Sequence, residues 1–78
     1  MKARAAVREV LMRRDLKIHR VAQRLGKKDS YITDKLSQVR ATDNMGLETF
    51  CAILNAADYK VVAMPREVRT PVDGIELE

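Results

Sequence analysis

The sequence predicts a mainly α-helical bundle of about four helices that ends in a C-terminal strand or β-hairpin. Two observations lead to this fold class. Apolar residues recur at helical spacing in four segments between residues 1 and 59. After residue 59 they form a short β-branched run instead, which is typical of a strand. We therefore divide the chain into a helical domain, residues 1–59, and an extended segment, residues 60–78.

The chain has 78 residues, which corresponds to one domain with a small core. A domain of this size buries only about 60–65% of its unfolded surface, so its stability is modest and dimerisation is favoured. Its single cysteine excludes an internal disulfide and fits a reducing cytosol. We expect no membrane span, because no run approaches about 20 apolar residues, and no signal peptide, because no apolar run follows the first basic residues.

The net charge of +4 is divided unevenly along the chain. Residues 1–40 carry 12 Lys and Arg against four Asp and Glu, which gives +8, whereas residues 41–78 carry three against seven, which gives −4. Such a basic half is typical of proteins that bind a polyanion. The alternative is a solvated basic face that has no partner.

Residues 1–16 are predicted to form the first helix. Its apolar stripe consists of Ala3, Val7, Val10 and Leu11. Most of its arginines lie off this stripe. Arg13 and Arg14 stand at the end that approaches the next helix, where they can reach phosphates.

Residues 17–24 and 29–38 are predicted to form two short helices joined by a tight turn. Their apolar faces consist of Val21, Ala22 and Leu25 in the first and Ile32, Leu36 and Val39 in the second. Gly26 lies where a helix ends in a left-handed residue. Asp29 or Lys28 begins the next helix, and Asp29 is the better cap. This is the helix-turn-helix pattern, whose second helix usually enters the major groove of DNA.

The outward face of the second motif helix is compact and rich in hydroxyl groups, which suits base edges and phosphate oxygens. It consists of Ser30, Tyr31, Thr33, Asp34 and Ser37. Tyr31 is predicted either to contact a sugar or a thymine methyl group, or to pack over Leu25 with its hydroxyl in water. Asp34 opposes DNA binding unless it pairs with Lys35 or Arg40 or accepts from a cytosine amino group.

Basic and amide side chains around the motif are the predicted contacts to DNA phosphates. They are Arg13, Arg14, Lys17, Lys27, Lys35, Arg40 and Asn44. Asn44, in the loop of residues 39–46, is equally suited to a local turn. His19 is expected to be an exposed surface residue, and no metal site is predicted because no Cys or carboxylate stands at ligand spacing.

Residues 47–59 are predicted to form the fourth helix, which has the clearest amphipathic pattern in the chain. Its apolar face consists of Leu47, Phe50, Cys51, Leu54 and Ala57. Cys51 is interpreted as a small core residue, because no catalytic partner accompanies it.

Residues 60–64 are predicted to form a strand that Pro65 ends, and a second extended segment follows the turn signal PVDG. A single hairpin is marginal in water, so we expect it to pair with the same element of a second chain in a two-fold dimer. The predicted dimerisation residues are Val61, Val62, Met64, Ile75 and Leu77. The alternative is a tail that is partly disordered after Pro65.

Three pieces of the sequence, in this order and spacing, carry a family resemblance over residues 11–64. They are VAQRLG, SYITDKLSQ and GLETFCAILNAADYKVV. Together they resemble the lambda-repressor-like family of DNA-binding domains, the Cro and Xre-type regulators. The resemblance implies that Lys17 and Arg40 contact flanking phosphates. It also implies that the residues facing the major groove are Lys28, Asp29, Ser30, Tyr31, Thr33 and Asp34.

The resemblance implies a sequence-specific transcriptional regulator, a repressor of the phage or plasmid type, that binds double-stranded DNA as a homodimer in a bacterial cytoplasm. The alternative is an antitoxin-type module whose acidic, extended C-terminal segment masks a toxin-like partner protein, and such a module can also bind DNA. We expect no enzymatic activity and no cofactor, because the chain has one His, one Cys and no Gly-rich phosphate loop.

Overall fold

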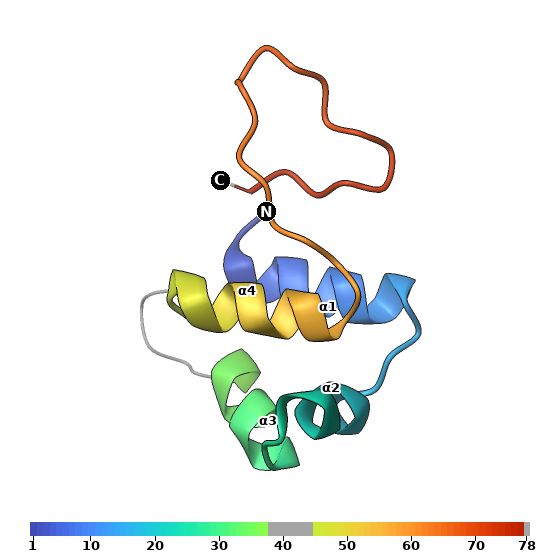
Figure 1. The fold of residues 1–78 in the computed structure, drawn as a ribbon, viewed down its shortest axis with the longest axis vertical. Coiled ribbons are helices and arrows are strands. Elements are labelled where there is room, and N and C mark those ends of the chain that lie inside the picture. Colours follow the sequence, from blue (N-terminus) through green and yellow to red (C-terminus); the bar gives the residue numbers. More distant parts are fainter. Residues whose placement is uncertain (38–44, 78) are drawn as a thin grey trace.

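The fold, obtained as a computed structural model that describes residues 1–37 and 45–77, contains four helices (Figure 1). Their bounds are α1 Ala3–Arg13, α2 Ile18–Leu25, α3 Asp29–Ser37 and α4 Leu47–Ala56. The mainly helical class and the order of the four helices are therefore confirmed. Helices α1 and α4 end earlier than predicted. A residue in the left-handed conformation, Asp15 after α1 and Asp58 after α4, prevents each helix from continuing.

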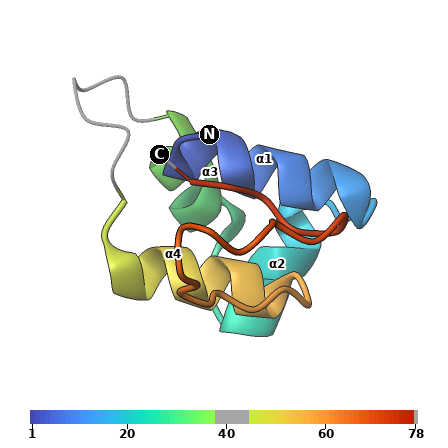
Figure 2. The ribbon, with the colours of Figure 1, turned by 90° about the horizontal axis from the view of Figure 1, so that it is seen from above.

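The four helices form two layers, and the C-terminal tail, residues 59–77, lies outside both. Helices α1 and α4 pack side by side, α2 and α3 cover one face of this pair, and the tail loops over the opposite face (Figures 1 and 2). The two ends of the chain lie close together, because the N-terminal ammonium donates to the Glu76 carbonyl over 3.1 Å. Helices α2 and α3 therefore lie on the side of the molecule away from the tail (Figure 1).

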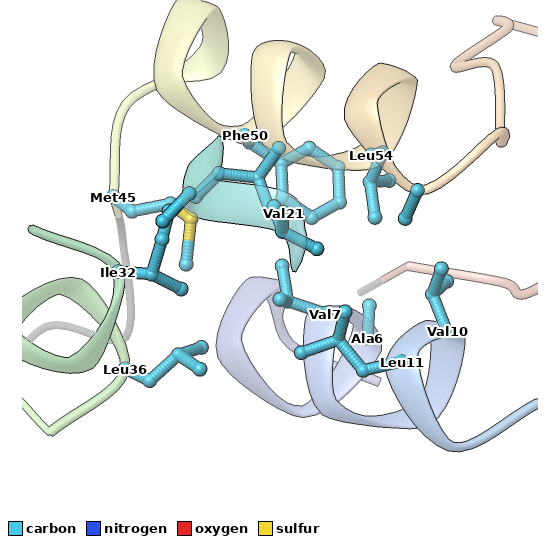
Figure 3. Close-up of a cluster of buried hydrophobic side chains, with 13 residues drawn as sticks. Ala6, Val7, Val10, Leu11, Val21, Ile32, Leu36, Met45, Phe50 and Leu54 are labelled. Atoms are coloured by element: carbon cyan, nitrogen blue, oxygen red, sulfur yellow. The ribbon is translucent and has the colours of Figure 1, made fainter. Parts of the chain in front are cut away.

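A single apolar core joins all four helices (Figure 3). Its fully enclosed side chains include Val7 and Val10 from α1, Val21 from α2, Ile32 from α3 and Ile53 from α4. Burying an aliphatic side chain of this size contributes about 1.5–3 kcal/mol. Because α2 and α3 are each shorter than ten residues, they depend on this burial rather than on intrinsic helix stability.

Three of the four helices end through the same backbone motif. Gly26 follows α2 at φ 68°, and the Lys27 amide donates to the Ala22 carbonyl over 2.9 Å. Asp15 follows α1 at φ 50° and Asp58 follows α4 at φ 64°, each with the equivalent bonds. This is the Schellman arrangement, which pairs carbonyls that a helix otherwise leaves free. The predicted role of Gly26 is confirmed.

The structure corrects the predicted apolar face of α4. Leu47 is 72% exposed, whereas Ile53, which the sequence reading left out, is 1% exposed. Leu47 is the first residue of the helix, and helical side chains lean towards the N-terminus. Its side chain therefore lies beyond the core, which Phe50, Ile53 and Leu54 enter instead.

The structure also corrects the predicted C-terminal strand or hairpin, because residues 1–37 and 45–77 contain no strand. The tail instead makes two tight turns, in which the Val68 amide donates to the Pro65 carbonyl and the Gly74 amide to the Pro71 carbonyl. Two prolines remove ladder donors, and no neighbouring strand is present in the described chain to pair with the β-branched run. Composition favoured a strand here, but a strand also requires a partner.

The tail contacts the helices near its end and stands away from them in between. Ile75 packs against the helical core, and an open cavity of about 1030 Å³ separates much of the tail from α1 and α4. Of the predicted dimerisation residues, Val61, Val62, Met64 and Leu77 are exposed. No helix in the described ranges is long and apolar enough to cross a membrane.

Replacing Gly26 tests the left-handed turn that sets the angle between α2 and α3. A Cβ at this position meets no atom within 4 Å, so any cost comes from the backbone alone. We expect Gly26→Ala to lower the free energy of unfolding by about 1–2 kcal/mol in urea, and Gly26→Asn to cost less because Asn tolerates this conformation. Equal losses in the two variants would contradict this explanation.

Candidate nucleic-acid interface

The α2–α3 unit is held as one piece by its turn and its buried side chains. Val21 and Ala22 of α2 and Ile32 of α3 have no exposed surface. The small Ala22 belongs to the apolar face predicted for this helix. With Ile32 and Leu36 buried, the opposite side of α3 is presented to solvent at a fixed angle.

The solvent-facing side of α3 carries small polar side chains. Ser30, Thr33, Asp34 and Ser37 are exposed, at the spacing of a single helix face. The Ser37 hydroxyl donates to the Thr33 carbonyl over 2.6 Å, so it is turned back onto its own helix. Ser30, Thr33 and Asp34 remain as the side chains on this face that can approach an external ligand.

Asp29, one of the predicted base-reading residues, contacts a side chain of α2. The His19 Nδ1 lies 3.0 Å and 3.2 Å from the two carboxylate oxygens of Asp29. Helix α3 begins at Asp29, so Lys28 occupies the capping position before it. The predicted capping role of Asp29 is not found, but its charge still lies at the positive end of the helix dipole.

Tyr31, for which the sequence allowed either a DNA contact or packing over Leu25, lies partly in the core and partly at the surface of α3. Its side chain is half-buried and packs against the edge of the core, as does Leu25. The Lys27 ammonium lies 5.4 Å from the centre of its ring and the Lys35 ammonium 5.5 Å. These are cation–π distances. The residue thus combines a fixed ring with two cations on the flank of α3.

Arg13 and Arg14, predicted to contact phosphates, are engaged within the protein. Arg13 donates from Nε to Glu9 over 3.0 Å and from Nη1 to the Asp73 carbonyl over 3.4 Å. The hydrogen bond with Glu9, and after it that with Tyr59, raises the pKa of Arg13. Arg14 Nη2 lies 3.6 Å from Asp58. These two arginines line the cavity between the helices and the tail.

Two further arginines tie the helical layers together. Arg8 of α1 donates to the Leu36 carbonyl in the last turn of α3 over 3.0 Å. Arg24 of α2 donates to the Ala56 carbonyl at the end of α4 over 2.7 Å and to Asp58 over 3.1 Å. A cation at a helix C-terminus stabilises the helix dipole. These arginines therefore have structural roles.

The remaining cations around α2 and α3 form what we call the cationic rim, which consists of Lys17, Arg20, Lys27 and Lys28. All four are exposed, and within residues 1–37 and 45–77 no carboxylate pairs with any of them. The sequence analysis did not predict Arg20 as a DNA contact. Its position could have indicated one, because it stands three residues after Lys17, the N-cap residue of α2, and residues three apart lie on the same side of a helix.

Two predicted phosphate contacts, Arg40 and Asn44, lie outside the described residues. No group of three His, Cys, Asp or Glu side chains in the described part of the chain is placed to hold a metal ion. Cys51 is half-buried in α4 as a free thiol.

Comparison with protein-family models, with curated proteins and with solved structures found no match.

Arg24 and Arg20 form a matched pair that tests the division between structural and external cations. We expect Arg24→Gln to lower the free energy of unfolding by about 1 kcal/mol, because it loses bonds to Ala56 and Asp58 at a partly exposed site. Arg20→Gln should change it by less than about 0.5 kcal/mol. Urea unfolding of the two variants measures both values, and a larger loss in Arg20→Gln would show a structural role there.

Proposed function

We propose that the protein is a non-catalytic, sequence-specific regulator that binds double-stranded DNA through α3. The observation that carries this proposal is the placement of an exposed, hydroxyl-bearing helix face among the four side chains of the cationic rim. Phosphate neutralisation by such cations supplies most of the salt-dependent affinity of DNA-binding proteins. Compact polar side chains on a projecting helix suit base edges in the major groove.

The charge of each surface supports this orientation. Residues 17–37, which include α2 and α3, carry six Lys and Arg against two Asp, whereas the tail, residues 59–77, carries three Lys and Arg against three Asp and Glu. A polyanion is therefore attracted more strongly to the first surface than to the second. The family resemblance of residues 11–64 points to the same class of ligand.

Within the site, affinity and selectivity are assigned to different residues. Lys17, Arg20 and Lys28 contact phosphates, which position the protein without reading sequence. Ser30, Thr33 and Asp34 face the base edges. Asp34 selects for an amino donor such as that of cytosine, because its carboxylate repels phosphates and acceptor atoms.

Salt-dependent binding of duplex DNA tests this proposal. In fluorescence anisotropy over a salt series, we expect Arg20→Gln and Lys28→Gln each to make the slope of log K against log salt shallower by about 0.9. Arg69→Gln, which removes an exposed arginine of the tail, is the matched control and should leave the slope unchanged. Equal effects of all three variants would indicate non-specific charge attraction.

The protein is further proposed to act as a homodimer joined through the tail. Val62 is 61% exposed and Val72 is 96% exposed, and burial of such side chains against a second copy stabilises association. Because α3 lies on the side of the molecule away from the tail (Figure 1), such a dimer would present its two α3 helices on opposite faces, and each would contact DNA separately.

A variant pair tests the dimer. In sedimentation equilibrium we expect Val62→Asp to weaken dimerisation at least tenfold, because burying an unpaired carboxylate costs more than about 1.4 kcal/mol. Met12→Asp is the control, since Met12 is also exposed but lies on α1. Dimers that persist in Val62→Asp would place the interface elsewhere.

A second candidate function, an antitoxin-type interaction module, is favoured by the same exposed tail. Its apolar side chains and unpaired backbone suit the edge of another protein as well as they suit a second copy. If the unmodified protein is monomeric at all concentrations, the exposed apolar tail is available to a different partner. That result would favour the antitoxin-type function over the homodimer.

A further inference from the structure

Three residues on one flank of α3 are brought together as a unit that the sequence reading treated separately. Lys27 lies in the turn before α3, four residues before Tyr31, and Lys35 follows Tyr31 by four residues on the same helix. Both ammonium groups lie about equally far from the ring centre, at 5.4 Å and 5.5 Å. The ring itself is held by packing against the core.

Both lysines lie near one ring without an acidic partner. No carboxylate in the described ranges pairs with Lys27 or Lys35. Each lysine loses rotamer freedom when it is ordered, and the two like charges repel one another. The negative face of an aromatic ring offsets part of this cost. Tyr31 is thus the feature that keeps the two cations on one flank of α3.

We propose that Tyr31 is a positioning residue that holds Lys27 and Lys35 as a preorganised pair for backbone phosphates of DNA, and that it does not read bases. This rests on the proposed DNA-binding function. Ordering the lysines before binding removes part of the entropy that each would lose on contact with a phosphate. The structure thereby reassigns Tyr31 from base reading, where sequence placed it, to backbone affinity.

The role predicts a pattern across variants that base reading would not produce. Tyr31→Phe keeps the ring face and should bind as the unmodified protein does. Tyr31→Leu keeps an apolar side chain but removes the ring, and should weaken binding about fivefold on every duplex tested. In a Lys27→Gln, Lys35→Gln background, Tyr31→Leu should have no further effect. Lys17→Gln with Lys28→Gln is the matched control background, in which the fivefold effect should remain.

A measurement without DNA tests the same unit even if Tyr31→Leu does not fold. In the proton NMR spectrum of the unmodified protein, the ε-methylene signals of Lys27 and Lys35 should be shifted upfield by the ring relative to those of Lys28. In a separate sample with a short duplex, these upfield shifts should remain, because a preorganised pair contacts phosphates without leaving the ring.

Several results would overturn the proposal while leaving DNA binding intact. Weakening by Tyr31→Leu on one sequence alone would restore the base-reading role. A loss in Tyr31→Phe equal to that in Tyr31→Leu would assign the contact to the hydroxyl. Unshifted lysine signals would mean that the ring does not hold the cations in solution. Failure of the unmodified protein to bind any duplex would instead reject the proposed function, and the phosphate role with it.

Discussion

The enclosed contact between Ile32 of α3, Val21 of α2 and Val7 of α1 is the constraint on which the rest of the structure depends. All three side chains are withdrawn from solvent. Helix α3 has nine residues, too few to be stable alone in water, so its formation and its direction both follow from this burial. Any function of its outer face therefore depends on the core. A substitution that left a cavity at Ile32 would change the position of α3, and with it the interface, without altering any surface residue.

Some of the cations hold the fold together and others are free for an external ligand, and a count of charges does not separate the two groups. Arg8 and Arg24 close helix ends across the boundary between the layers, and Arg13 and Arg14 hold acids near the tail. Lysines predominate among the cations left for an external partner. Guanidinium groups suit fixed multi-bond contacts, whereas ammonium groups on flexible stems suit phosphates whose positions vary. The +8 of the first 40 residues thus overstates the charge available to a ligand.

Sequence reasoning succeeded where structure is decided locally. The left-handed Gly26 and the buried faces of α2 and α3 follow from residue type and spacing within one or two turns. It failed where an outcome needs a distant partner: the β-branched tail forms no strand within the described residues because none is there to pair with it, and Asp29 turned to His19. The spacing of four between Lys27, Tyr31 and Lys35 was visible in the sequence, but the approach of both ammonium groups to one ring became apparent only in the structure.

Under the proposed function, the repulsion between the carboxylates of α3 and DNA determines how the protein selects one base sequence over another. Asp29 lies 3.0 Å from the His19 ring, whereas Asp34 stays exposed on the outer face without such a contact. An unpaired carboxylate facing DNA weakens binding to most sequences and is tolerated only where a base offers an amino donor. Rejection of wrong sites in this way requires no additional attractive contact. The cationic rim, whose side chains lie on α2 and in the turns beside it, must then supply enough affinity to offset that repulsion, so phosphate contacts and base contacts come from different parts of the α2–α3 unit.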